Sequence, residues 1–118
     1  MSESQTRSRR IQLSAALLAA TAGAILFVES PAEANPREHV VVMANMKFGS
    51  LPANARVGDT ILWVNRGTVA HTATPRNKSF DVRVAAGQRR RMKLTRAGVY
   101  PIYCILHPAM RGSLKVAQ

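Results

Sequence analysis

The sequence of 118 residues contains a single cysteine, Cys104, and is poor in acidic and aromatic residues. One cysteine cannot form an intramolecular disulfide, and it excludes a Cys-x-x-Cys zinc or haem signature. Six acidic residues stand against 17 Lys and Arg residues, and the net charge of +11 indicates an acidic partner or surface. Aromatic residues make up only 5% of the chain, so no stacking platform for nucleic-acid bases is visible.

The hydrophobic content of 47% excludes an intrinsically disordered chain, and the length allows one domain at most. The first ten residues are polar and contain three arginines, and residues 11–28 form a run without a charged side chain. Small residues at Ala32 and Ala34 then stand where a signal peptidase reads the chain. We therefore predict a signal peptide over residues 1–34, cleaved after Ala34, and a periplasmic location for the mature protein.

Two features leave the N-terminal segment open to other interpretations. The uncharged run approaches the ~20 residues that span a bilayer, so an uncleaved membrane anchor is the alternative. The adjacent Arg9 and Arg10 resemble a twin-arginine export signal, although many ordinary signal peptides share such a pair. Residues 35–118 carry the whole net charge of +11, because the first 34 residues hold three basic and three acidic side chains.

The pattern of residues 35–118 predicts strands, with no helical period, internal repeat or low-complexity segment. Residues 60–65 form a nearly continuous apolar run between two glycine-containing turns, which is typical of a buried strand. Other expected strands are rich in valine or alternate apolar and polar side chains; they lie within residues 39–48, 80–84, 89–95, 99–103 and 113–117. Short strands at close intervals predict one small all-β domain, a sandwich or a barrel.

The chemically distinctive residues gather near the end of the sequence. Cys104, His107 and Met110 fall within seven residues, on an expected loop between two strands. In an oxidising compartment, a lone thiol beside a histidine is oxidised or mispaired unless something occupies it, and a metal ion would do so. A thiolate and imidazoles suit zinc as well as copper. The thioether favours copper, because a trigonal His2Cys site with a long axial Met is the blue-copper arrangement.

The second histidine of such a site must come from elsewhere in the chain, where only His39 and His71 are available. His71 follows the buried strand over residues 60–65 after a short loop, which places it at the end of that strand. His39 lies near the start of the expected mature chain. We therefore expect His71 to be the second histidine.

These residues carry a resemblance to a known family. The segments that resemble the cupredoxins, the blue type 1 copper proteins, are Val57 to Asn65, His71-Thr72 and Tyr103-Cys104-x-x-His107-x-x-Met110-x-Gly112. The short ligand loop is similar to that of the amicyanin- and plastocyanin-like members. The resemblance implies a Greek-key β-sandwich that holds one copper ion cycling between Cu(I) and Cu(II). It also implies that His71, Cys104 and His107 are the strong ligands and Met110 the axial one.

The function implied by this resemblance is that of a small one-electron carrier, without enzymatic activity. The expected partners are redox proteins, such as a dehydrogenase or a c-type cytochrome, with an acidic docking surface. We expect a monomer that binds no nucleic acid. The alternative is a protein for copper delivery or storage, but such proteins usually show open Met- or His-rich sites. A catalytic dyad of Cys104 with a histidine is disfavoured, because no third residue or substrate cleft is evident.

Some finer expectations concern the surroundings of the copper site. The turn Arg96-Ala97-Gly98 predicts a hairpin between residues 89–95 and 99–104, which would place Arg89 and Arg91 at the copper end, pointing outward. There they could form a basic rim with Arg111, Arg76 and Lys78.

Two further expectations concern single residues. Leu106 stands where related loops have a proline, and we expect its backbone N–H to point at the Cys104 sulfur. The methionines outside the ligand loop, Met43, Met46 and Met92, are expected to fill the core.

Overall fold

The computed structural model describes residues 19–28 and 35–118. Residues 19–28 contain no helix or strand, and no helix in the described parts of the chain is long and apolar enough to cross a membrane. The Arg9-Arg10 pair and the expected cleavage site at Ala34 lie outside the described residues, as does most of the expected signal peptide. The chain divides between Ala32 and Glu33 into two units, and all the strands described below belong to the second.

The second unit is built from strands, as the alternating sequence pattern predicts. Within the described residues the strands are β1 (Glu38–Ala44), β2 (Lys47–Phe48), β3 (Ala55–Arg56), β4 (Thr60–Asn65), β5 (His71–Pro75), β6 (Val82–Val84), β7 (Arg89–Lys93), β8 (Gly98–Cys104) and β9 (His107–Ala117). The buried strand predicted over residues 60–65 is confirmed as β4 with the same bounds.

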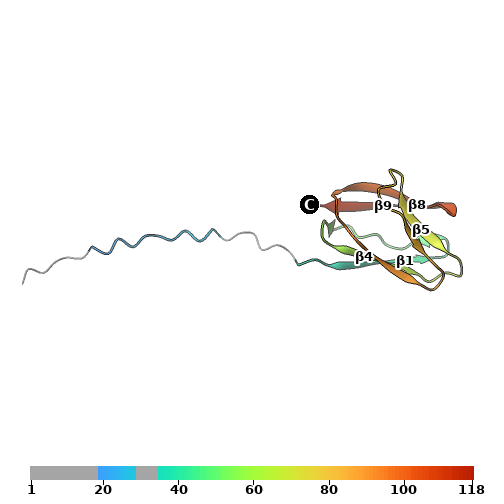
Figure 1. Ribbon diagram of the computed structural model, residues 1–118, viewed down its shortest axis with the longest axis horizontal. Helices are drawn as coiled ribbons and strands as arrows, with labels where there is room; N and C mark the ends of the chain where they lie inside the picture. The colour runs from blue at the N-terminus through green and yellow to red at the C-terminus, as the bar shows by residue number, and fades with distance from the viewer. Residues whose placement is uncertain (1–18, 29–34) are drawn as a thin grey trace, which may run out of the picture. The chain divides into compact units, whose positions relative to one another are not determined.

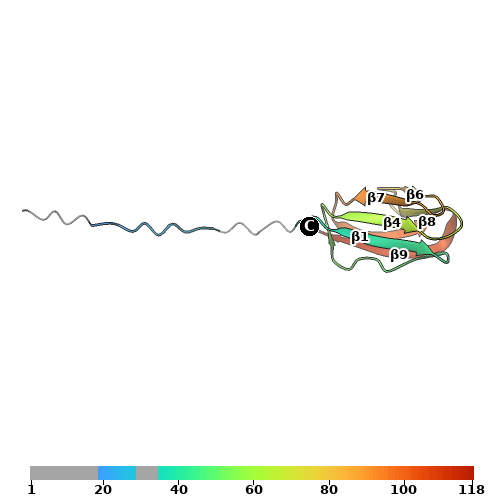
Figure 2. The ribbon, with the colours of Figure 1, turned by 90° about the horizontal axis from the view of Figure 1, so that it is seen from below.

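These strands form two sheets that pack face to face (Figure 1, Figure 2). One sheet has the order β2-β1-β4-β7 and the other the order β3-β9-β8-β5-β6. Most neighbouring strands are antiparallel, whereas β1 with β4 and β3 with β9 are parallel. The chain crosses from one sheet to the other after β2, β3, β4, β6 and β7, as connections in a Greek-key sandwich do. The expected β-sandwich is thereby confirmed.

The core lies between the sheets and follows the period of two along the central strands. Val41 and Met43 of β1 and Trp63 of β4 are fully buried, and Leu114 of β9 meets them from the opposite sheet. The ring of Trp63 packs edge-on against Phe48, with ring centroids 6.1 Å apart. Burying such large side chains supplies most of the favourable free energy of a small domain without a disulfide.

The hairpin expected around Arg96-Ala97-Gly98 is wrong. β7 pairs only with β4 among the described strands, and β8 pairs with β9 and β5 in the other sheet. The turn therefore crosses between the sheets, and Cys104 does not lie across from Arg90. The physical reason is that a glycine-containing turn fixes a change of direction but not the strand with which each arm pairs.

One other local expectation is corrected by the structure. Met46 does not fill the core, because it lies with Asn45 in the tight turn between β1 and β2 and is largely exposed. Both residues have positive φ angles, 52° for Asn45 and 60° for Met46. Met43 is buried as expected, and Met92 is half-buried.

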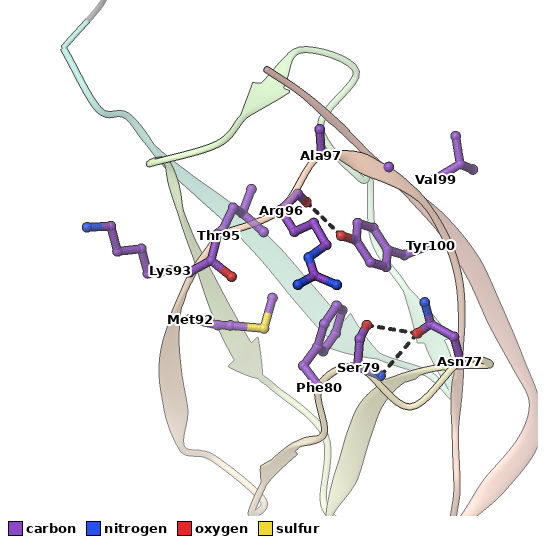
Figure 3. A pocket seen from close by; sticks show the side chains of 12 residues that line it. Asn77, Ser79, Phe80, Met92, Lys93, Thr95, Arg96, Ala97, Val99 and Tyr100 are labelled. Carbon is purple, nitrogen blue, oxygen red and sulfur yellow. Dashed lines mark hydrogen bonds between the residues drawn. The ribbon is translucent and has the colours of Figure 1, made fainter.

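A pocket of about 530 Å³ opens at the end of the sandwich where β7 ends and β8 begins. Its walls include the rings of Phe80 and Tyr100, whose centroids lie 5.7 Å apart, and the side chain of Arg96 points into it (Figure 3). The Tyr100 hydroxyl donates a hydrogen bond of 2.6 Å to the Arg96 carbonyl, which holds the crossing turn. None of the candidate metal ligands lines this pocket.

Candidate metal centre

Three of the predicted site residues stand at strand ends that meet at one end of the sandwich. His71 is the first residue of β5, Cys104 the last of β8 and His107 the first of β9. The loop expected between Cys104 and the last strand is only the two-residue turn Ile105-Leu106, because β9 begins at His107 and is longer than predicted. Cys104 and His107 are paired across this turn, beyond a register shift between Tyr103 and Cys104 in the β8–β9 ladder, and the short turn fixes their spacing.

The donor atoms of these residues converge. The Sγ of Cys104 lies 3.8 Å from the Nδ1 of His71 and 3.6 Å from the Nδ1 of His107. The two imidazole rings meet edge to face, with centroids 5.0 Å apart. One donor atom from each of the three residues lies within 4.8 Å of the others. Met110, the fourth predicted residue, is buried in the same core cluster as Cys104.

This spacing fits a single soft metal ion. Donors bound at about 2.0–2.3 Å to one ion lie about 3.6–3.8 Å apart at angles between tetrahedral and trigonal, which agrees with both measured S–N separations. The donor set is a thiol and two imidazole nitrogens, with a buried thioether nearby in the sequence. The thiolate and the imidazoles suit zinc as well as copper, and the thioether favours copper, so the residues present fit the expected group.

The loop that leads into His71 is held by the side chain of Asn65. Its amide nitrogen donates to the carbonyls of Val69 and Val84, and its Oδ1 accepts a hydrogen bond of 2.8 Å from the Gly67 backbone. A Cβ at Gly67 would come within 3.2 Å of the Asn65 oxygen and 3.5 Å of the His71 Nε2. Glycine at this position therefore lets the loop pass close to the imidazole and its anchor.

Burial sets the protonation of the inner histidine. His71 is 1% exposed, and desolvation lowers its pKa below the ordinary value, with a smaller contribution from the positive charge of a protonated His107. A lowered pKa favours the neutral imidazole, which is the form that binds a metal. His107 is only half-buried, and its neighbours Ile105 and Leu106 are each 43% exposed. The outer histidine thus lies within a small apolar surface.

The sulfur of Cys104 receives its hydrogen bond from β5. The backbone N–H of Thr72 donates to Sγ across 3.2 Å. The Leu106 amide, which we expected in this role, is not a donor to the sulfur in the described part of the chain, so that expectation is wrong. Thr72 also accepts a hydrogen bond of 2.9 Å at its Oγ1 from the backbone of Ile105. Thr72 therefore ties the segment that begins at His71 to the segment that contains Cys104, through both its backbone and its side chain.

The resemblance to the cupredoxins marks the position of Thr72, because related proteins often have an asparagine there that helps to tie the two loops together. From the sequence, a threonine at this position left the rigidity of the site in doubt, and its double role was not predicted. Its contacts depend on β5 lying beside β8, and residues 71–75 were not recognised as a strand.

The rejected histidine, His39, lies in a different environment. Its Nε2 is 2.8 Å from a carboxylate oxygen of Asp59, near the start of β1 and β4. Asp59 also accepts hydrogen bonds from the backbones of Arg37 and Arg56. These interactions, led by the Arg37 hydrogen bond and then that of His39, lower the pKa of Asp59 to about 2. The structure thus gives His39 a structural partner and brings His71 to Cys104.

Known proteins are similar to this chain in sequence and in fold. No family model matches the chain. Amicyanin from Paracoccus denitrificans is 36% identical over 88 residues, which cover 65% of this chain and 63% of that protein. A solved reduced amicyanin variant is 30% identical with a TM-score of 0.55, and the match covers 65% of this chain and 79% of that one. The chain belongs to the cupredoxin family.

Two further solved structures are similar to this chain. An oxidised amicyanin variant has a TM-score of 0.57 at 29% identity over 65% of this chain and 79% of its own. A Cu(I) form of another variant has a TM-score of 0.58 at 28% identity over 67% and 81%. The sequence match spans less than two thirds of the curated amicyanin, so likeness to this cupredoxin does not by itself carry over its activity or partners.

Proposed function

We propose that this cupredoxin binds one copper ion and serves as a one-electron carrier rather than an enzyme. His71 and His107 would bind the ion through Nδ1 and Cys104 through its thiolate, with Met110 as a weak axial ligand. The observation that carries the proposal is the convergence of a buried thiol and two imidazole nitrogens within 4.8 Å on strands that come from separate parts of the chain.

Each part of the site has a role in this function. Bound copper supplies a couple between Cu(I) and Cu(II). The paired strands β8 and β9, together with the Thr72 contacts, hold the donors in place, so that little rearrangement accompanies a change of charge. Ile105 and Leu106 are exposed apolar residues that directly precede the partly exposed His107, so an apolar partner surface could approach the imidazole edge closely here.

The charge distribution supports acidic redox partners, such as a dehydrogenase or a c-type cytochrome. Within residues 35–118 there are only three acidic side chains, and each of them interacts with another side chain of the protein. Glu38 lies 2.8 Å from Arg91, Asp59 contacts His39, and Asp81 accepts from Thr74. The arginines therefore dominate the surface, and long-range attraction would speed the encounter with an acidic partner at low salt.

The place of the basic residues differs from the sequence expectation. Arg91 is opposite Leu62 in mid-strand and is paired with Glu38, so it is a poor docking residue. Arg89 and Arg90 instead line a pocket together with Arg83 of β6. Arg83 is opposite Thr72 in the β5–β6 ladder, one position from His71. These three arginines, which we call the arginine cluster, are the proposed docking charge.

The proposal also includes export of the protein, which depends on its N-terminal segment. Residues 1–34 would act as a signal peptide, cleaved after Ala34, and deliver a monomeric protein to the periplasm. The hydrophobic run and the small residues at the proposed cleavage site support this assignment.

The alternative function is copper delivery or storage, and one experiment separates the two. The copper-loaded protein is mixed with a small redox reagent and, separately, with a Cu(I) chelator. A carrier changes oxidation state quickly and reversibly while it keeps its copper over many cycles. Rapid loss of copper to the chelator together with slow, irreversible oxidation would instead indicate delivery or storage.

A further inference from the structure

A chain of polar side chains leads away from the candidate metal centre along β5 and ends at the protein surface. It starts at the backbone of Ile105, which directly follows Cys104, and passes through the hydroxyls of Thr72 and Thr74 to the carboxylate of Asp81. The successive donor–acceptor distances are 2.9, 3.0 and 2.7 Å. Both threonines are buried, with 3% and 1% of their surface exposed, whereas Asp81 is exposed.

The direction of every hydrogen bond in this chain follows from counting protons. An ionised carboxylate only accepts, so the Thr74 hydroxyl must donate its single proton to Asp81. The Thr74 oxygen is then free to accept, and Thr72 must donate to it. The Thr72 oxygen in turn accepts from the N–H of Ile105. Every donor and acceptor in this series therefore has a partner only when the hydrogen bonds all point the same way. They run from the turn Ile105-Leu106, which we call the ligand turn, to the carboxylate of Asp81.

The register of the sheet explains why these residues meet. Thr72 and Thr74 are two residues apart, so their side chains lie on the same face of β5. In the β5–β6 ladder Thr72 is opposite Arg83 and Ala73 is opposite Val82, and the next position brings Asp81 across from Thr74. The turn that returns the chain is itself held, because Lys78 donates to the Pro75 carbonyl and Ser79 donates to Asn77 (Figure 3).

We propose that Asp81 is a positioning residue for the copper site, acting through Thr74 and Thr72. The carboxylate fixes the orientation of the Thr74 hydroxyl, and this fixes the Thr72 hydroxyl as an acceptor for Ile105. Because the backbone of Thr72 holds the Cys104 sulfur, the chain locks the thiolate and the ligand turn to each other. Hydrogen bonds that end on a charged group are stronger than neutral ones, and a fully satisfied network in a buried region rigidifies its members.

This inference rests on the proposed copper site and makes two separable statements. The first is mechanical: the series of hydrogen bonds from Ile105 to Asp81 protects the Ile105 amide from hydrogen exchange, whether or not the protein has a redox function. The second is electrostatic: the negative charge of Asp81 favours the more positive Cu(II) state, so its removal raises the reduction potential. Asp81→Asn removes the charge but keeps an oxygen that accepts from Thr74. Thr74→Val keeps the charge and interrupts the chain with a side chain of the same shape.

The test measures amide hydrogen exchange by NMR on the reduced copper-loaded protein and the reduction potential of the same samples. Thr74→Val should speed exchange at Ile105 at least tenfold, and Thr74→Ser, which restores the hydroxyl, should return it to the wild-type rate. Asp81→Ala, which removes the acceptor of the Thr74 hydroxyl, should also speed exchange at Ile105, whereas Asp81→Asn, which keeps an acceptor oxygen, should change it less than threefold; both should raise the potential. Glu38→Gln, which removes a negative charge from the start of β1, is the charge control and should alter neither.

Two results would overturn the inference. Unchanged Ile105 exchange in Thr74→Val would show that the chain does not hold the ligand turn. Equal potential shifts in Asp81→Asn and Glu38→Gln would show that only the total charge of the protein matters. If the protein binds no copper, the proposed function fails, while exchange at Ile105 in the metal-free protein still decides whether the chain positions the turn.

Discussion

The backbone N–H of Thr72 donates a hydrogen bond to the Sγ of Cys104 across 3.2 Å, from β5 to the neighbouring β8. A hydrogen bond to a thiolate withdraws negative charge that would otherwise stabilise the oxidised metal. The donor lies on a strand in the middle of a sheet, so it does not depend on the sequence of the ligand turn. The position of this donor changes what is expected of substitutions in that turn.

Substitutions of Leu106 provide the first prediction. Since Thr72 supplies the N–H at the sulfur, Leu106→Pro removes no hydrogen bond from it. Leu106→Pro and Leu106→Ala should therefore give the same potential, each shifted only by the loss of a partly exposed apolar side chain. Voltammetry of the two copper-loaded variants checks this. A potential that falls only in the proline variant would restore the Leu106 amide as the donor.

The arginine cluster provides the second prediction. The double substitution Arg89→Gln with Arg90→Gln should slow the reaction of the reduced protein with a negatively charged oxidant such as ferricyanide, and should weaken its salt dependence. Stopped-flow traces at several ionic strengths give both quantities. The matched control is Lys93→Gln with Lys115→Gln, which removes the same charge from the ends of β7 and β9 that lie away from the site. Equal slowing in the control would mean that net charge, and not this cluster, attracts the oxidant.

The pH dependence of stability follows from Asp59. Its pKa falls from 3.8 to about 2 on folding, because the folded protein stabilises the ionised carboxylate more than the unfolded chain does. The resulting stabilisation is fully present above about pH 5 and is lost as the pH falls through 4 towards 2. Urea unfolding at pH 6, 4 and 3 should show a steeper loss of stability for the wild type than for Asp59→Asn. Parallel curves would mean that this carboxylate does not cause the acid sensitivity.

The turn between β1 and β2 provides a stability prediction. Asn45 tolerates its positive φ, but Met46 carries a long exposed side chain in the same left-handed region. Met46→Gly should raise the free energy of unfolding by about 1 kcal/mol, because glycine adopts this conformation without steric cost. Met46→Ala is the control and should gain nothing. Thermal unfolding of both variants measures the difference, and equal melting temperatures would contradict the argument.

Much of the fold follows from the local pattern. β4 could be predicted because Thr60–Asn65 is a run of large apolar residues between two turns. β5 could not, because His71–Pro75 consists of small and polar residues and ends in a proline. All five are nevertheless buried, since β5 lies between β8 and β6. Their burial comes from the neighbours that the topology supplies, which no short window of sequence contains.

The candidate site divides in the same way. Cys104, His107 and Met110 are close in sequence, so their spacing alone indicated a common site, and few histidines were left to complete it. The chain from Thr72 through Thr74 to Asp81 joins residues of ordinary type by strand register. Register was not predictable here, as the wrong hairpin at Arg96-Ala97-Gly98 shows.

The visible spectrum of the copper-loaded protein tests the central claim most directly. If Cys104 binds Cu(II) as a thiolate with His71 and His107, the protein should show an intense charge-transfer band towards the red end of the visible range. A reductant should bleach this band reversibly, and Cys104→Ser should abolish it. A protein that stays colourless with Cu(II), yet binds one equivalent of zinc tetrahedrally, would contradict the account.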